Sequence, residues 1–415
     1  MATAPKPRPS MKDAFVLPGF RKLWLAQFVS IFGDFLALFG VISLITFRWH
    51  GSVMHVTYVS IAYMAPLAIV GPVAGVFVDR WNVKRVMIAS DAIRAVLALL
   101  LVWATDIRQV SAILFAISCV SSFFGPSQSV TVRTLVPMDK MMAAQALMAQ
   151  AFYTVRLLSP ALAGTLISLL TEKACFYLDA ASFAFSAIML STIVIAHTPP
   201  PQGQRTMRSF FADFTSGNRF IFTHPSLAFV ITAMVSAMFV MSCFSPLISI
   251  YVRDTLHAGP FQFGIVSTMV GVGLIVGTQL ITRIAGNRSK KEIVLWGLLA
   301  AAVGVGLLGT FKVYAAAVAC TFGIGFGFAF VIVSAQTLMQ QETPRAMLGR
   351  VSSSFMSVFS CAQVFGLLLS GKLALWLSVR QVFQLCAAVL LMLTLAGFLR
   401  HQSTSNADSA PASAD

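Results

Sequence analysis

The sequence predicts an all-α integral membrane protein with 12 transmembrane helices arranged as two halves of six. Three observations support this fold class. Of the 415 residues, 58% are hydrophobic and only 10% are charged, whereas roughly a quarter of the residues in soluble domains are charged. Apolar runs recur that are long enough to cross a bilayer, which takes about 20 residues. A weak internal repeat relates the first half of the chain to the second.

The apolar runs follow one another with polar turns between them. A basic and aromatic collar, Phe20-Arg21-Lys22-Leu23-Trp24, precedes the first run and is typical of a membrane interface. This run is too long for the apolar part of a signal peptide and is followed by no small-x-small cleavage site, so we expect it to remain as the first span. The runs lie near residues 23–47, 56–78, 86–104, 110–130, 143–170, 174–195, 227–250, 261–284, 293–311, 314–333, 351–377 and 382–399.

The internal repeat emerges when the chain is shifted on itself by roughly 203 to 207 positions. Val70-Gly71 then meets Val276-Gly277, and Lys84-Arg85 meets Lys290-Lys291. Such symmetry is typical of transporters built from two six-helix halves, with a substrate path where the halves meet and transport by alternating access.

The polar segments divide the chain into five parts. Residues 1–17 form a cytoplasmic N-terminal segment, disordered or bound to the membrane surface, and 18–196 form the first bundle. Residues 197–225 form a cytoplasmic linker, in which 210–220 are expected to be an amphipathic helix lying on the membrane. Residues 226–400 form the second bundle, and the Ser- and Ala-rich residues 401–415 a disordered cytoplasmic tail.

The basic residues predict the orientation. With both termini in the cytoplasm, 20 of the 29 Lys and Arg residues lie inside, which agrees with the positive-inside rule. The same positions explain the net charge of +15 as a topology signal, so nucleic acid is not an expected partner. Six basic residues fall outside, namely Arg48, Arg108, Lys173, Arg253, Lys312 and Arg380, and the remaining three, Arg94, Arg156 and Lys372, lie in or near the apolar runs.

The residues that usually carry enzyme or metal chemistry are missing from suitable positions. The six cysteines lie within apolar runs without C-x-x-C spacing, and the six histidines lie in turns or at run ends. The motifs H-E-x-x-H, G-x-S-x-G and G-x-x-x-x-G-K-[ST] do not occur. We therefore expect no enzyme activity, no metal and no cofactor.

Two charges lie deep inside apolar runs, where each needs a reason because a charge costs at least a few kcal/mol in mid-membrane. Asp34 follows Lys22 by 12 residues, about 18 Å along a helix, and is the best candidate for a protonatable, proton-coupling group. Arg156 enters the fifth run from the same side and could pair with Asp34. The alternative is a structural acid satisfied by Gln27 or Ser30.

Other polar residues within the runs have less specific interpretations. Asp91 and Arg94 are spaced i,i+3 and are expected to form a structural ion pair near the cytoplasmic end of their helix. The role of Asp179 stays open. Gln128 and Gln363, like Gln27, could line a cavity or hydrogen-bond helices together.

Residues 75–85 form a basic hairpin between the second and third runs. Asp79 beside Arg80 can accept charge-assisted hydrogen bonds, the glycines at 71 and 75 would allow a helix to approach closely, and Lys84 and Arg85 would hold the turn at an anionic surface. The simpler interpretation is a topology signal. Because the second copy, residues 285–288, keeps a base and lacks the acid, we assign Asp79 and Arg80 a switch-like gating role.

These residues resemble the major facilitator superfamily, whose signature G-x-x-x-D-R-x-x-R-[KR] is similar to residues 75–85, with a departure at Asn82-Val83-Lys84-Arg85. The first run, together with Phe124-Gly125-Pro126 and the linker end, resembles the branch of bacterial macrolide-efflux and enterobactin-exporter proteins. By this resemblance Pro160 and Gly164 form a reduced exporter element in the fifth span. Many drug/proton antiporters carry an Arg in the fourth span, and here 110–130 has none.

The resemblance implies a monomeric secondary exporter in the bacterial inner membrane, one that moves amphipathic or apolar small molecules, drug- or siderophore-like, by proton antiport. Its partners would be a small-molecule substrate, protons and membrane lipid. Two alternatives stay open. A lysophospholipid flippase suits the 35 Phe and 19 Met equally well, and a non-transporting scaffold or sensor would have a sealed core with Asp34 fully paired.

Overall fold

The computed structural model describes residues 11–78, 81–195, 215–216, 218–284, 289–344 and 347–408. These residues fold into helices joined by short turns. Eleven helices in this part of the chain are long and apolar enough to cross a membrane, and α13 contributes the shorter apolar segment Ser357–Leu373. The predicted all-helical membrane fold is confirmed.

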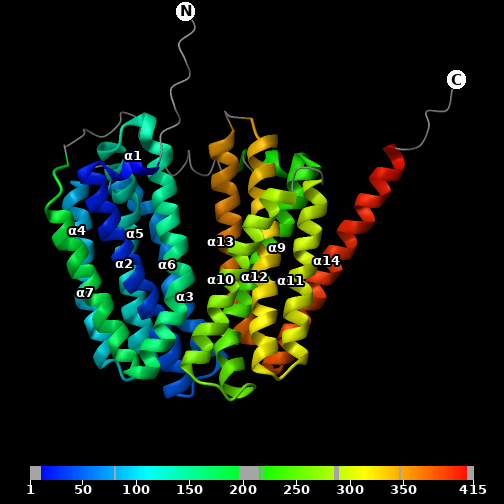
Figure 1. Cartoon of the computed structure of the whole chain (residues 1–415), viewed down its shortest axis with the longest axis horizontal. Helices are drawn as coiled ribbons and strands as arrows, with labels where there is room; N and C mark the ends of the chain where they lie inside the picture. Colours follow the sequence, from blue (N-terminus) through cyan, green and yellow to red (C-terminus); the bar gives the residue numbers. More distant parts are fainter. Residues whose placement is uncertain are drawn as a thin grey trace, which may run out of the picture. The chain divides into compact units, whose positions relative to one another are not determined.

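The chain divides into two compact units, one with Met1–His50 and Tyr58–Arg205, the other with Gly51–Thr57 and Thr206–Asp415. In Figure 1 the first unit runs in colour from blue to green and the second from green to red. The first six-helix bundle contains α2 (Pro18–Ser43), α3 (Val53–Val78, of which the residues from Tyr58 on belong to this unit), α4 (Val83–Leu100), α5 (Ile107–Leu135), α6 (Met141–Leu169) and α7 (Glu172–Ser191). The second contains α9 (Pro225–Asp254), α10 (Pro260–Ile284), α11 (Lys290–Thr310), α12 (Tyr314–Glu342), α13 (Leu348–Leu373) and α14 (Val379–Asp408).

In the first unit, α2 packs mainly against α7 and α6, and α4 packs against α7 and α5. Serine hydroxyls connect α5 to α3: Ser118 Oγ donates to the carbonyl of Tyr63, and Ser122 Oγ donates to that of Pro66 at 3.2 Å. In an apolar surrounding such side-chain bonds hold helices together where the hydrophobic effect does not. Helix α7 thus has α2 on one side and α4 on the other.

Lysines fix the C-terminal end of α7. Lys84 Nζ donates to the carbonyl of Ser191 at 2.7 Å, and Lys22 Nζ donates to that of Thr192 at 3.4 Å. The last carbonyls of a helix have no partner within it and carry partial negative charge, so a lysine there is favourable. These contacts place the starts of α2 and α4 and the end of α7 at one level.

In the second unit, α12 lies against α10 and α11 through glycines. A Cβ built at Gly277 would lie 2.7 Å from the Cβ of Ala329, and one at Gly297 would lie 2.7 Å from the carbonyl oxygen of Gly327. Small residues let membrane helices approach backbone to backbone. At the other end, Arg380 at the start of α14 donates to the last carbonyls of α11, those of Gly309 and Thr310, both at 2.8 Å.

The two chain ends differ from their prediction where they are described. Residues Met11–Phe15 form the short helix α1, whose Ala14 is fully buried, and the Phe15 ring contacts Trp24 edge-on at 5.3 Å. An apolar face packed on the bundle therefore orders part of the segment. At the other terminus α14 continues to Asp408, so this part of the expected disordered tail is helical.

Parts of the hairpin, of its second copy and of the linker lie outside the described residues: Asp79, Arg80 and the contacts of Gly75, residues 285–288, and most of the expected amphipathic helix. Residues 218–223 at its end are helical. Among the described residues, no atom lies within 4 Å of a Cβ built at Gly71, so these residues provide no close helix contact at this glycine. Arg85 lies in the first turn of α4, where its N–H donates to the capping side chain of Asn82 at 3.2 Å.

Candidate functional site

Four ionisable side chains meet in the interior of the first unit. Asp34 comes from α2, Asp91 and Arg94 come from α4, and Asp179 comes from α7. We call these four residues the acid cluster. Their helices begin or end at the level fixed by Lys22 and Lys84, and Asp34, Arg94 and Asp179 lie 10 to 12 residues from it, which is about 15–18 Å along a helix.

Arg94 is the centre of the acid cluster. Its Nη2 binds Asp91 Oδ1 one turn earlier on α4, and its Nη1 lies 3.7 Å from Asp34 Oδ2. The guanidinium carbon lies 4.7 Å from the ring centre of Phe124 and 4.3 Å from that of Phe183. Two aromatic faces and a buried carboxylate therefore hold the cation in place, while Asp34 is its more distant carboxylate partner.

Asp179 on α7 is the third carboxyl group near Arg94. It is 1% exposed, and within the described residues its Oδ1 accepts no hydrogen bond. It lies within electrostatic range of both Asp34 and Arg94, and the phenol of Tyr63 on α3 lies within range of the same groups. A second acid on α7 therefore shares the single arginine with Asp34.

Gly33 makes this approach of α2 and α7 possible. A Cβ at this position would lie 2.7 Å from Asp179 Oδ1 and 2.8 Å from Ser182 Cβ, both shorter than the contacts that real Cβ atoms make. Only a residue without a side chain fits there. The glycine before Asp34 thus brings the third carboxyl into the acid cluster.

The acid cluster holds three carboxyl groups and one guanidinium. With all of them ionised it would carry two uncompensated negative charges inside the bundle, where charge is expensive and neighbouring carboxylates disfavour each other's ionisation. A group of this kind titrates as a unit and can take up or release protons. Protons can reach the acid cluster through Asp34, because its side chain is 20% exposed, whereas the side chain of Asp91 is fully buried.

The partner expected for Asp34 was wrong. Arg156 is an exposed residue of α6, and the arginine that reaches Asp34 is Arg94. The expected contact between Asp91 and Arg94 is confirmed. What the sequence interpretation missed is that Asp34 and Asp179 join that pair. Counting residues from the level of Lys22 and Lys84 would have put Asp34, Arg94 and Asp179 at one depth, but the count was applied only to Asp34 and Arg156.

The remaining candidates are dispersed. Gln27 is 4% exposed on α2, with no hydrogen-bond partner for its Nε2 among the described residues. Half-buried Gln128 donates to Met148 Sδ at 3.7 Å. Gln363 lies half-buried on α13 in the second unit. Pro160 and Gly164 are buried in α6, which runs through them without a break.

A stability prediction follows from Gly33. We expect Gly33→Ala to destabilise the protein by about 1–3 kcal/mol, because the added methyl group overpacks the contact between α2 and α7. The matched control is Gly323→Ala on α12, where no atom lies within 4 Å of a built Cβ. This change is expected to be neutral or stabilising. Thermal unfolding of the two purified variants, followed by scanning fluorimetry, measures the difference; equal midpoints would contradict the close packing at Gly33.

The comparisons with known proteins agree with this architecture. The Major Facilitator Superfamily model matches residues 23–353 and 230–414. The chain belongs to this superfamily. It is 26% identical to the uncharacterized MFS-type transporter YfiS of Bacillus subtilis, over 91% of this chain and 92% of that protein. Its resemblance to macrolide-efflux and enterobactin-exporter proteins is confirmed by two further relatives.

These relatives share about a quarter of their residues with this transporter. Macrolide efflux protein A of Streptococcus pyogenes is 24% identical, covering 91% of this chain and 94% of that protein. Enterobactin exporter EntS of Citrobacter koseri is 24% identical, covering 86% and 85%. Among solved structures, the nucleoside transporter NupG superposes with a TM-score of 0.70 at 15% identity, over 92% of this chain and 98% of that one. The structural likeness shows the fold alone.

Proposed function

We propose that this transporter is a secondary active exporter that couples the efflux of amphipathic or apolar small molecules to proton influx by alternating access. One observation carries the proposal: three carboxyl groups and one arginine lie together inside the first unit, and one of these carboxyls, Asp34, has a partly exposed side chain. The names of the efflux-type relatives support a drug- or siderophore-like substrate. We infer a monomer in the bacterial inner membrane, with both termini in the cytoplasm.

The geometry suggests how a proton would act. Arg94 is held on α4 by Asp91 and by two aromatic rings, so it stays in place when Asp34 changes its charge. A proton on Asp34 removes the attraction that spans 3.7 Å between α2 and α4. Loss of the proton restores this attraction. Protonation thus favours one arrangement of α2 against α4 over another, which is what a coupled cycle requires.

The acid cluster also bears on the alternative of a non-transporting scaffold. That alternative expects Asp34 to be fully paired in a sealed core. Asp34 has instead an exposed fraction of 20% and a partner at 3.7 Å, which supports an accessible, exchangeable group. A lysophospholipid flippase would be distinguished by its substrate, and the transport experiment below includes one.

Transport by the purified protein in liposomes tests the proposal. The panel contains a macrolide, a lipophilic cationic dye, a catecholate siderophore and a fluorescent lysophospholipid, each with and without an imposed pH gradient. Because protons and substrate move in opposite directions, a substrate should accumulate in liposomes with an acidic lumen and not in liposomes at equal pH. If only the lysophospholipid is taken up, the protein is a flippase and not an exporter. If no compound shows gradient-dependent uptake, the proposal is contradicted.

The hairpin should affect the rate of the cycle. We expect Asp79→Asn to slow turnover and leave substrate binding intact, because residues 75–85 join α3 to α4 at the end of the bundle, far along the helix from the acid cluster. Initial efflux rates and equilibrium binding of the same substrate measure the two effects separately. Asp139→Asn, which removes the same charge from an exposed acid in the turn between α5 and α6, is the control and should leave the rate unchanged. An unchanged rate for Asp79→Asn would argue against the gating role.

A further inference from the structure

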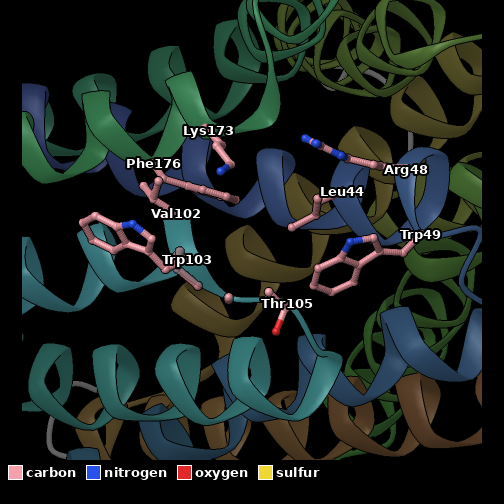
Figure 2. Close-up of a pocket in the computed structure, with 10 residues that line it drawn as sticks. Leu44, Arg48, Trp49, Val102, Trp103, Thr105, Lys173 and Phe176 are labelled. Atoms are coloured by element: carbon pink, nitrogen blue, oxygen red, sulfur yellow. The ribbon is translucent and has the colours of Figure 1, made fainter.

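A cavity of about 350 Å³ lies in the first unit, at the end opposite to Lys22 and Lys84. Three elements form it: the end of α2 with the following turn, the end of α4 with the following turn, and the first turn of α7. Figure 2 shows the side chains of Arg48 and Lys173 together on one side of the cavity, with the rings of Trp49 and Trp103 flanking it. The predicted orientation places this end of the unit outside the cell.

The backbone leaves the α-helical form on two sides of the cavity. Leu44–Arg48 form one turn of π-helix, in which the N–H of Trp49 donates to the carbonyl of Leu44 at 2.9 Å. Leu101–Trp103 form a turn of 3₁₀-helix. Trp49 directly follows the π turn, and Trp103 is the last residue of the 3₁₀ turn. Single π turns within helices are frequent at functional sites.

The apolar part of the cavity lies where α2 and α7 pack closely. A Cβ built at Gly40 on α2 would lie 2.9 Å from Cys175 Cβ and 3.2 Å from Phe176 Cε1 on α7. Phe176 is 1% exposed and lines the cavity together with Leu44 and Val102. Close contact between α2 and α7 therefore fixes the position of the apolar floor of the cavity.

Four of the side chains around this floor carry N–H donors: Arg48, Trp49, Trp103 and Lys173. Arg48 Nη1 binds Glu172 at 3.4 Å, and Glu172 is 10% exposed, so that acid offsets one of the two cations. Within the described residues the side chain of Lys173 has no hydrogen bond or ion pair, and the same is true of the indole N–H groups of Trp49 and Trp103. One positive charge and several donors thus face the cavity without an acceptor.

We propose that this cavity binds the anionic group of an amphipathic molecule, a phosphate or carboxylate carried on an apolar body. The anion would accept from Lys173, Arg48 and the indoles, and the apolar body would cover Leu44, Val102 and Phe176. A neutral apolar ligand would leave these donors without partners. The site is distinct from the acid cluster, and its occupation needs neither a gradient nor a proton on Asp34.

Binding to the full-length protein in dodecyl maltoside tests the site. We expect lysophosphatidylglycerol or dodecanoate to give a saturating change of tryptophan fluorescence that the double variant Trp49→Phe/Trp103→Phe lacks. Lysophosphatidylcholine, which has no net charge, and inorganic phosphate, which has no apolar body, should bind at least about tenfold more weakly. Equal binding by lysophosphatidylcholine or by inorganic phosphate would overturn the proposal.

The basic residues supply the matched comparison. Lys173→Gln is expected to weaken the binding of the anionic amphiphile about tenfold, and because Lys173 has no partner among the described residues, this change leaves no buried acid behind. Arg108→Gln, an exposed base in the first turn of α5 that does not line the cavity, should have no effect. Equal affinity in these two variants would refute the site.

The two anionic probes separate the possible sources of the ligand. Tighter binding of lysophosphatidylglycerol identifies a membrane lipid, and tighter binding of dodecanoate identifies a free carboxylate amphiphile; either result supports the proposal. Repeating the titration with Asp34→Asn tests whether binding at the cavity is independent of the proton cycle. Unchanged affinity in this variant, which is expected not to transport, supports a cavity that binds its ligand independently of the acid cluster. Loss of binding would contradict that independence.

Discussion

Asp34→Asn is expected to abolish efflux driven by a pH gradient while the protein remains folded and inserted. Asparagine has nearly the shape of a protonated aspartate and cannot release a proton, so the attraction between α2 and Arg94 is lost permanently. Uptake into liposomes with an acidic lumen should fall to the level of protein-free liposomes. Exchange of labelled for unlabelled substrate without a gradient should persist, because that exchange does not require a proton to leave.

An exposed acid provides the control for this variant. Asp106 lies just before α5, exposed, and belongs to neither the acid cluster nor the cavity. Asp106→Asn removes the same charge from the chain and is expected to retain full gradient-driven uptake. Normal coupled efflux by Asp34→Asn would end the assignment of Asp34 as the proton-coupling group.

Arg94→Gln is expected to have the largest effect on stability. Arg94 is 4% exposed and is the one cation of the acid cluster, so its removal leaves two buried carboxyl groups and the partly exposed Asp34 without a counter-charge. Breaking a buried ion pair by removing one partner costs about 3–5 kcal/mol. Thermal unfolding in detergent should show a clear loss of stability at neutral pH. The loss should shrink on acidification, which neutralises the carboxyl groups.

A double variant separates charge from packing. Arg94→Gln with Asp91→Asn removes one charge of each sign and should recover part of the stability that Arg94→Gln alone loses. Arg156→Gln, which changes an exposed base on α6, is expected to stay within about 0.5 kcal/mol of the unaltered protein. A destabilisation by Arg156→Gln as large as that by Arg94→Gln would restore the pairing that the sequence alone suggested.

The fold could be predicted because it follows from local properties of the chain. A span needs about 20 apolar residues, a rule that holds for each run independently of its neighbours. The described helices agree with the runs in number and order, and they extend beyond several of them, as α5 does by continuing to Leu135. The ends were harder. Burial of Ala14 and the ring contact of Phe15 depend on tertiary packing that the composition of the segment does not reveal.

The acid cluster could be predicted only in part. The depth of Asp34 follows from a residue count, but its partner depends on which face of α4 turns toward α2, and an apolar span carries little periodicity to settle this. The i,i+3 spacing predicts the contact of Arg94 with Asp91, but it does not predict the contact of Arg94 with Asp34. Gly33 was a usable signal, because a glycine beside a buried acid marks a position where another helix comes close.

Proton release on substrate binding tests the central claim most directly. The purified protein is placed in weakly buffered detergent solution with a pH indicator, and a substrate identified in the liposome panel is added. If Asp34, Asp91, Asp179 and Arg94 form the coupling site, the unaltered protein releases protons as substrate binds and Asp34→Asn binds the same substrate without releasing them. Equal proton release from both proteins would contradict the assignment of coupling to this cluster.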